Sequence, residues 1–425
     1  MEKVKRIYFV GIKGVAMAAL ALWAKESGKV VAGSDVGEEF PTDEELKKAG
    51  IVVHEGFDQN TIIAFKPDLV IYTGAHGGRD NPQVQEAILR SISVVPHGKA
   101  LGMVTRNKRL IAVAGSHGKT TTSAMVAAIL TEAGLHPSYA IGCGSIRGLG
   151  AAGHRGVGEW FVAEADEYVT DPGHDRTPRF LWLKPEVLVV TNIDYDHPDV
   201  YPDLSAVQHA FIALQKQSTF TCICGEDEAS SVLKKSGSVA TFGVSEQLSS
   251  IQLQIPGRHN MLNAAAAVSV CERIGISWEV CKRALERFGG TKRRFEKINE
   301  VRGAFIYDDY AHHPKEIEAT IGAFRDAYPG KRIIVIFQPH TYSRTKALLT
   351  EFSRALSKAD IALVADIYAS AREIQTEEGL AKKLGGLYKP TKNDVIEWLS
   401  KELKADDVIV FMGAGDIYQW AREMI

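Results

Sequence analysis

The sequence Leu110-Ile-Ala-Val-Ala-Gly-Ser-His-Gly-Lys-Thr-Thr-Thr122 joins an apolar run to an amphipathic segment through a short turn. The run Leu110–Ala114 predicts a buried strand, and Lys119–Glu132 has apolar residues at helical spacing. The turn between them contains Gly115 and Gly118. Backbone N–H groups and the helix dipole at such a helix N-terminus attract anions, so this segment predicts a phosphate-binding loop in an α/β fold.

The residues of this loop have distinct predicted roles. We expect Lys119 to lie in an exposed loop and to reach the outer phosphates, while the Thr120 hydroxyl would bind Mg²⁺. The general phosphate-loop pattern has a glycine where this chain has Val113. The alternative is an ordinary strand–helix turn that happens to contain Gly-Lys-Thr. The predicted phosphate-binding residues are Gly115, Ser116, His117, Gly118, Lys119, Thr120 and Thr121.

The composition limits the class of protein. Hydrophobic residues make up 45% of the 425 residues, which predicts packed cores and about three domains. The 50 basic and 52 acidic residues nearly balance, so no overall charge favours nucleic acid. Five cysteines without a CxxC pair predict free thiols in a reducing compartment. We find no apolar run typical of a signal peptide or a membrane span, and we therefore expect a cytoplasmic protein.

Residues 1–106 alternate between strand and helix patterns and predict a Rossmann-like domain. Gly11 and Gly14 lie in the first strand–helix turn, and Asp35 ends the next strand. In dinucleotide-binding folds an acid at this spacing contacts a ribose. Because Ala16 replaces the third glycine of that motif, the pattern fits a nucleotide-diphosphate pocket or a plain Rossmann turn. His76 lies in a polar loop after a later strand.

Residues 107–289 form the predicted ATP-binding domain, and two of their strands end in acidic residues. The apolar strand that begins at Trp160 leads to three acids, Glu164, Asp166 and Glu167, and the strand that begins at Val187 leads to Asp194, Asp196 and His197. Carboxylates and an imidazole beside a phosphate loop predict a Mg²⁺ site, although acids at strand ends are also common in solvated loops.

Two asparagines precede the predicted helix Ala264–Arg273 in the same domain. Asn260 and Asn263 would either bind a base edge or cap that helix.

Residues 290–425 predict a third α/β domain of Rossmann-like type. Three of its strands are followed by polar or glycine-rich sequences, and the carboxyl ends of parallel strands meet at one sheet edge. The polar side chains expected at that edge are Asp308, Asp309, His312, His313, His340 and Arg344.

These motifs, in this order, resemble those of the Mur ligases, the ATP-dependent amino-acid-adding enzymes of peptidoglycan synthesis, over essentially the whole chain. The third-domain motifs resemble the alanine-adding branch of the family. The segments that carry the resemblance are Gly115–Thr122, Glu164–Glu167, Asp196–His197, His259–Asn260 with Asn263, Arg293–Phe295, Asp308–Pro314, and Phe337–His340 with Tyr342–Arg344.

The resemblance implies ATP-dependent joining of L-alanine to the lactyl carboxylate of UDP-N-acetylmuramate through an acyl phosphate, with Mg²⁺. It implies small-molecule substrates, no nucleic-acid or membrane partner, and a monomer or homodimer. It implies catalytic roles for Lys119, Glu164, His197, His340 and Arg344, and metal binding by Thr120, Glu164 and His197. ATP would also contact Asn260, Asn263, Arg294 and Asp309. The UDP-sugar would contact Gly11, Gly14, Ser34, Asp35 and His76, and the amino acid would contact His312, His313 and Arg344.

The sequence also departs from the family pattern. Thr341 stands where an arginine is common, and Tyr168–Lys184 is more similar to the branch that recycles the murein tripeptide L-Ala-γ-D-Glu-meso-diaminopimelate. That branch is therefore an alternative. Because no lysine lies between His197 and Lys216, we expect no carbamylated lysine near the metal. A nucleotide-regulated binding module and a nicotinamide oxidoreductase are alternatives from other classes, but the acidic strand ends and the Lys119 loop disfavour them.

Overall fold

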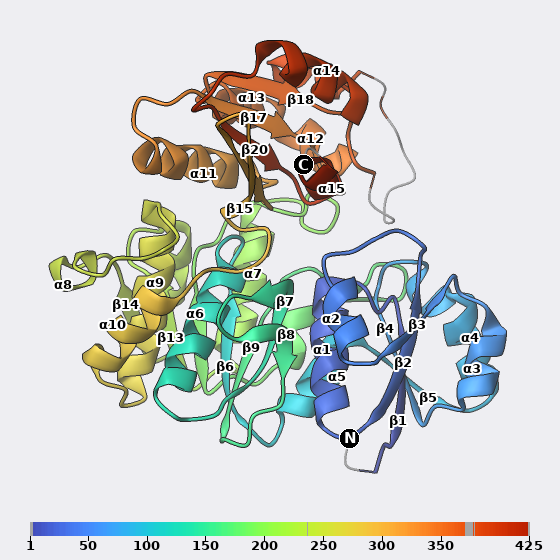
Figure 1. Cartoon of the computed structure of the whole chain (residues 1–425). Coiled ribbons are helices and arrows are strands. Elements are labelled where there is room, and N and C mark those ends of the chain that lie inside the picture. Colours follow the sequence, from blue (N-terminus) through green and yellow to red (C-terminus); the bar gives the residue numbers. More distant parts are fainter. Residues whose placement is uncertain (1–2, 236, 370–376, 378, 424–425) are drawn as a thin grey trace. The chain divides into compact units, whose positions relative to one another are not determined.

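A computed structural model describes residues 3–235, 237–369, 377 and 379–423. It contains three main sheets with parallel strands and flanking helices (Figure 1), so the predicted α/β class is confirmed. The chain divides into two compact units, and the predicted domain boundaries stay predictions. The first unit consists of Met1–Tyr195, Asp203–Gln254 and Leu262–Lys292, and the second of Asp196–Pro202, Ile255–Met261 and Arg293–Ile425.

The first sheet is entirely parallel, because each strand is followed by a helical crossover. Its strands lie in the order β3 (Val52–Glu55), β2 (Val30–Asp35), β1 (Arg6–Val10), β4 (Leu69–Tyr72) and β5 (Ser93–Pro96). The helices are α1 (Val15–Glu26), α2 (Asp43–Lys48), α3 (Gln59–Phe65), α4 (Pro82–Leu89) and α5 (His97–Thr105). The four apolar residues of β4 are all buried, as the unbroken apolar run predicts.

The second sheet has seven strands and also belongs to the first unit. Its order is β14 (Val239–Phe242), β13 (Phe220–Cys224), β12 (Val187–Val190), β6 (Arg109–Ala114), β9 (Trp160–Glu164), β7 (Ser138–Ile146) and β8 (Gly150–His154). Only the pairing of β7 with β8 is antiparallel. Helix α1 of the first sheet contacts β7 and β8, so the two sheets share a packed interface.

The helices that accompany this sheet are α6 (Lys119–Glu132), α7 (Leu204–Gln215), α8 (Glu246–Ser249), α9 (Arg258–Arg273) and α10 (Trp278–Arg287). Helix α9 begins at Arg258, six residues earlier than the alanine-rich pattern predicts. Asn260 and Asn263 therefore lie within the helix, and their interpretation as its N-terminal caps is wrong. All five cysteines are buried free thiols.

The third sheet lies in the second unit. Its order is β15 (Glu296–Val301), β16 (Ala304–Asp309), β20 (Val408–Met412), β17 (Ile333–Phe337), β18 (Ile361–Val364) and β19 (Leu387–Tyr388). The helices are α11 (Pro314–Ala327), α12 (Tyr342–Ala347), α13 (Leu349–Leu356), α14 (Lys392–Glu402) and α15 (Ile417–Glu423). Because β16, β20 and β17 are adjacent and parallel, their carboxyl ends share one edge, as predicted.

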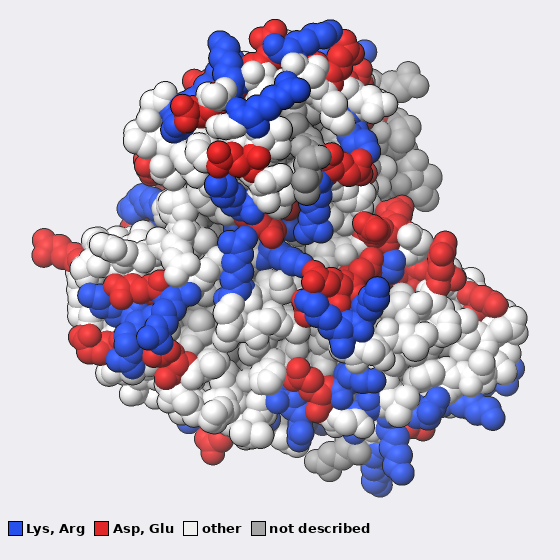
Figure 2. Space-filling model, in the orientation of Figure 1, with Lys and Arg blue, Asp and Glu red and all other residues white. Residues whose placement is uncertain are grey.

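The surface agrees with the balanced composition. On the face drawn in Figure 2, Lys and Arg side chains are interspersed with Asp and Glu side chains. Among the described residues, no helix combines the length and apolarity needed to cross a membrane.

Candidate active site

The predicted phosphate loop follows β6 and ends at the N-terminus of α6. Gly118 is the N-cap of α6 in a left-handed conformation with φ of 80°. A Cβ atom there would lie 2.4 Å from Oδ1 of Asn263, so the backbone requires glycine at this position. Asn263 also accepts a hydrogen bond from the Thr122 hydroxyl at 3.2 Å. The structure therefore brings Asn263 together with the loop, although the two are far apart in sequence.

Polar residues after β12, the neighbour of β6, brace this loop. The Thr191 hydroxyl and the Asn192 amide donate to the carbonyl of His117 at 2.5 and 3.0 Å. The Asn192 side-chain oxygen accepts from the His117 N–H at 3.0 Å. The backbone N–H of Asp194 donates to Ser116 Oγ at 2.8 Å. Sequence reasoning missed the roles of Thr191 and Asn192, although their place after a buried strand beside β6 was a usable signal.

Lys119 is mostly buried, so the expectation of an exposed loop is wrong. Its Nζ donates to the Gly115 carbonyl at 2.6 Å and pairs with the Glu167 carboxylate at 3.0 Å. Burial alone would lower the pKa of Lys119, but the carboxylates of Glu167, Asp166 and Glu164 outweigh it and raise the pKa above its usual value. A permanently charged ammonium group thus lies at the start of α6, where an anion is also favoured by the helix dipole.

Thr120 and Glu164 are also brought together. The Thr120 hydroxyl donates to both carboxylate oxygens of Glu164 at 3.0 and 3.1 Å, and the Gly142 N–H donates to Oε2 at 2.8 Å. The two residues meet because β6, which leads into α6 and Thr120, is adjacent in the sheet to β9, which ends at Glu164. His197 belongs to the second unit, so the predicted metal set of three residues is not contained within one unit.

In the first sheet, the predicted nucleotide-sugar residues surround the turn after β1. The carboxylate of Asp35 accepts from the Lys13 N–H at 2.7 Å and lies 3.4 Å from Nε2 of His76. Burial raises the pKa of Asp35, against the opposing effect of the Lys13 and Val36 N–H groups and His76. The carbonyl of Ser34 accepts from the Gly11 N–H at 2.8 Å.

The structure also shows the surroundings of Gly14, Ala16 and Ser34 in this region. Gly14 is the N-cap of α1 with a negative φ of −55°. Ala16 is partly exposed, so its methyl group is accommodated where the pattern has a glycine. Its carbonyl accepts from Nε2 of His97 at 3.1 Å. The Ser34 hydroxyl is fully buried and bonded to Tyr8 and Gln83, so its contact with a ligand stays a prediction.

In the second unit, Arg344 and Asp196 form a buried ion pair. Nε and Nη2 of Arg344 donate to Oδ1 of Asp196 at 2.8 and 2.7 Å, and each residue is about 95% buried. Burial acts to raise the pKa of Asp196, but His197, Arg344, His313 and His312 hold it well below its usual value. The predicted amino-acid-binding residues therefore gather around one carboxylate, which the sequence alone did not indicate.

His340 and Tyr368 also lie on this side of the third sheet. The imidazole of His340 lies 6.1 Å from that of His312 and stacks on Tyr368 at 5.8 Å between ring centroids. Tyr368 was missed, because it follows β18 without a recognisable motif.

The predicted ATP contacts of the second unit lie at the ends of β15 and β16. The Asp309 carboxylate accepts from the Phe295 and Ala311 N–H groups at 2.8 and 2.9 Å. Arg294 lies over the Tyr310 ring at 5.1 Å, and 3.7 Å from Glu316. Asn260, in the first turn of α9, donates to the Pro256 carbonyl at 2.7 Å.

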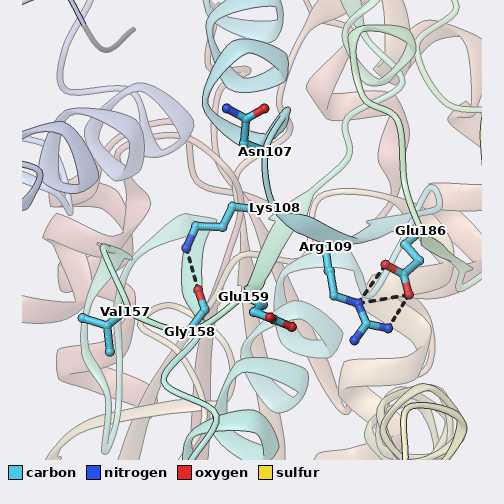
Figure 3. Close-up of a pocket in the computed structure, with 7 residues that line it drawn as sticks. All are labelled: Asn107, Lys108, Arg109, Val157, Gly158, Glu159 and Glu186. Carbon is cyan, nitrogen blue, oxygen red and sulfur yellow. Dashed lines mark hydrogen bonds and ion pairs between the residues drawn. The ribbon is translucent and has the colours of Figure 1, made fainter.

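A pocket of about 530 Å³ lies at the opposite, amino-terminal edge of the second sheet (Figure 3). In its lining, Lys108 Nζ donates to the Gly158 carbonyl at 2.5 Å, and Arg109 pairs with Glu186 at 2.6 Å. None of the predicted site residues lines it. Because ligands of parallel sheets bind at the carboxyl ends of strands, the phosphate-loop edge is the candidate active site.

Comparisons with known proteins agree with this arrangement. Three family models match: the Mur ligase family catalytic domain at residues 6–109, the Mur ligase middle domain at 113–247, and the Mur ligase glutamate ligase domain at 293–415. The UDP-N-acetylmuramate–L-alanine ligase of Aquifex aeolicus is 36% identical over 458 aligned residues, covering 100% of this chain and 98% of that protein.

Solved structures are similar over the same length. The UDP-N-acetylmuramate–alanine ligase of Thermotoga maritima has a TM-score of 0.80 at 28% identity, covering 99% of this chain and 98% of that one. A murein peptide ligase from Psychrobacter arcticus has a TM-score of 0.75 at 22% identity, covering 99% of both chains, and supports the fold alone. Full-length identity above 30%, together with three matching models, shows that this chain belongs to the Mur ligase family.

Proposed function

We propose that this protein is an ATP-dependent ligase that joins L-alanine to the lactyl carboxylate of UDP-N-acetylmuramate in peptidoglycan precursor synthesis. The observation that carries the proposal is the full-length similarity to a UDP-N-acetylmuramate–L-alanine ligase. The buried Lys119 ammonium at the start of α6 supports it, because a triphosphate needs a fixed positive charge at a helix N-terminus. The murein-peptide alternative rests on a less similar structure.

The residues near the loop fit the proposed cofactors. ATP phosphates would lie against the N–H groups of Gly118, Lys119 and Thr120, since the first N–H groups of a helix have no acceptor within it. The adjacent oxygens of Thr120 and Glu164 are hard ligands of the kind that Mg²⁺ prefers, and we assign them to that ion with His197 as a further ligand. When bound, Mg²⁺ would neutralise charge that develops on the phosphates.

The proposed reaction has two steps. The lactyl carboxylate attacks the γ-phosphate of ATP, and Lys119 stabilises the charge on the transferred group as ADP leaves. The amine of L-alanine then attacks the acyl phosphate, and phosphate leaves as the amide forms. We assign His312, His313 and Arg344 to the amino acid, and His340 to the reacting groups. Asp35 and His76, with the glycines of the first turn, would hold the nucleotide-sugar.

The remaining assignments are proposals of the same kind. Asn260, Asn263, Arg294 and Asp309 would contact ATP, and the domains would span 1–106, 107–289 and 290–425. We expect a cytoplasmic monomer or homodimer.

A phosphate-release assay tests the function. With ATP, Mg²⁺, UDP-N-acetylmuramate and L-alanine we expect one phosphate and one UDP-N-acetylmuramoyl-alanine per turnover, identified by mass spectrometry. Omission of either UDP-N-acetylmuramate or L-alanine should abolish formation of the product. Phosphate release that does not depend on L-alanine or any peptide would contradict the proposal.

The proposed metal ligands give a further prediction. Glu164→Gln should raise the Mg²⁺ concentration for half-maximal ligation by about tenfold, because an amide oxygen binds Mg²⁺ more weakly than a carboxylate. The measurement is a Mg²⁺ titration at saturating substrates. Glu186→Gln is the matched control, since Glu186 pairs with Arg109 at the opposite edge of the same sheet. If the titrations of Glu164→Gln and the parent protein overlay, Glu164 is not a ligand.

A further inference from the structure

A short antiparallel hairpin follows the acidic residues at the end of β9. It consists of β10 (Val169–Asp171) and β11 (Asp175–Pro178), and a 3₁₀ helix, Arg179–Trp182, follows it. Its base is tied to Asp166, whose carboxylate pairs with Arg179 at 2.8 Å and whose carbonyl accepts from the Phe180 N–H at 3.0 Å. The hairpin therefore starts from the same strand end that holds Glu164.

The hairpin contacts the polar loop that follows β4, residues 73–82, in the first unit. Asp171 is 2% exposed, and its Oδ2 accepts from the Arg79 N–H at 2.9 Å. His174 lies 2.8 Å from the Asp80 carboxylate. The pKa of Tyr72, at the end of β4, is raised to about 12 by burial and by the nearby Asp171 carboxylate.

The loop passes so close to the hairpin that it has no room for side chains at two positions. A Cβ atom at Gly78 would lie 2.6 to 2.8 Å from the Asp171 carboxylate, and φ of Gly78 is +54°. A Cβ atom at Gly74 would lie 2.7 Å from the Thr170 carbonyl. Asp171 thus defines where the backbone of the loop lies.

His76 lies in this loop between Gly74 and Gly78, and it reaches the proposed nucleotide-sugar site. His76 has a positive φ of 54°, and the Asn81 amide donates to its carbonyl at 3.0 Å. Nε2 of His76 is 3.4 Å from Oδ1 of Asp35. A continuous series of contacts therefore runs from Asp166 through Asp171 and the loop to Asp35.

We infer that Asp171 is a positioning residue for the nucleotide-sugar: it holds the loop of residues 73–82, and with it His76, in the conformation that binds UDP-N-acetylmuramate. The hairpin then supports the loop that binds UDP-N-acetylmuramate and has no part in the selectivity for the amine substrate. This inference rests on the proposed function, because it concerns the affinity for one of its substrates.

Steady-state kinetics of the full-length enzyme test the inference. Asp171→Ala should raise KM for UDP-N-acetylmuramate by tenfold or more, while kcat and KM for ATP and L-alanine stay within twofold of the parent. Asp171→Asn should restore most of the affinity, because its amide oxygen can still accept from the Arg79 N–H. Asp175→Ala is the matched control: it removes another carboxylate of the hairpin, which accepts from the Thr177 N–H at 2.9 Å, and leaves the Asp171 side chain and its contact with the Arg79 N–H in place.

The outcomes are distinct. An unchanged KM for UDP-N-acetylmuramate in Asp171→Ala would overturn the inference, as would an equal rise in all three KM values. An equal effect of Asp175→Ala would also overturn it, because the effect would then not depend on the Asp171 contact. If the parent enzyme forms no UDP-N-acetylmuramoyl-alanine, the proposed function fails instead, so the two failures are distinguishable.

A second comparison remains informative if Asp171→Ala is poorly folded. Gly78→Ala should itself raise KM for UDP-N-acetylmuramate, because the new methyl group meets the Asp171 carboxylate. In an Asp171→Asn background the added effect of Gly78→Ala should persist, since the amide fills the same space, whereas in an Asp171→Ser background, with its shorter side chain, it should be smaller. Equal effects in all three backgrounds would contradict the contact.

Discussion

Lys119→Ala is expected to reduce the rate of ATP-dependent ligation by about 10³-fold or more, because it removes the fixed positive charge beside the proposed transferred phosphate. The measurement is product formation under saturating substrates, with folding checked by circular dichroism. Near-normal ligation by a folded Lys119→Ala protein would contradict the assignment of the phosphate loop.

The structure adds a stability effect to this prediction. Removing Lys119 leaves the Glu167 carboxylate, which is 1% exposed, without its ammonium partner. Loss of one partner of a buried pair costs about 3 kcal/mol or more of unfolding free energy. The double variant Lys119→Met with Glu167→Gln removes both charges and should recover most of that stability while staying inactive. Recovery of stability without activity separates the chemical role of Lys119 from its structural role.

L-Alanine is expected to be accepted, and the tripeptide L-Ala-γ-D-Glu-meso-diaminopimelate refused, with a ratio of kcat/KM of about 100 or more. The proposed acceptor residues include His313 and Arg344, each 4% exposed, and His312. A longer acceptor would deny such buried groups their contact with the alanine carboxylate, at about 1–3 kcal/mol each. Two such groups account for a ratio of this size, because 1.4 kcal/mol corresponds to about tenfold.

The competition between acceptors is measured at saturating ATP and UDP-N-acetylmuramate. Glycine and L-serine should be weaker acceptors than L-alanine, and they serve as controls because each differs from it only slightly in size. A ratio below one would favour the murein-peptide alternative and would make Tyr168–Lys184 the better guide to specificity. The contacts of that segment with residues 73–82 argue that it acts on the nucleotide-sugar side.

The strand–turn–helix units were predictable from local patterns, because burial and helical periodicity are encoded in neighbouring residues. The helix α6 has the expected bounds, and the strand β6 ends at Ala114 as expected. The carboxyl-end placement of Glu164 and Asp309 followed as well, since parallel strands share one functional edge. Helix α9 was predicted to start too late, because polar residues in its first turns hide the helical period.

Long-range partners required the tertiary structure. The pairing of Lys119 with Glu167, of Arg344 with Asp196, and of Asp171 with the Arg79 N–H joins residues on separate elements. A sequence specifies the type of each charged group, but sheet order and loop path decide which groups become neighbours. Burial then decides their charge state, because a carboxylate or ammonium removed from water keeps its charge only beside a compensating partner.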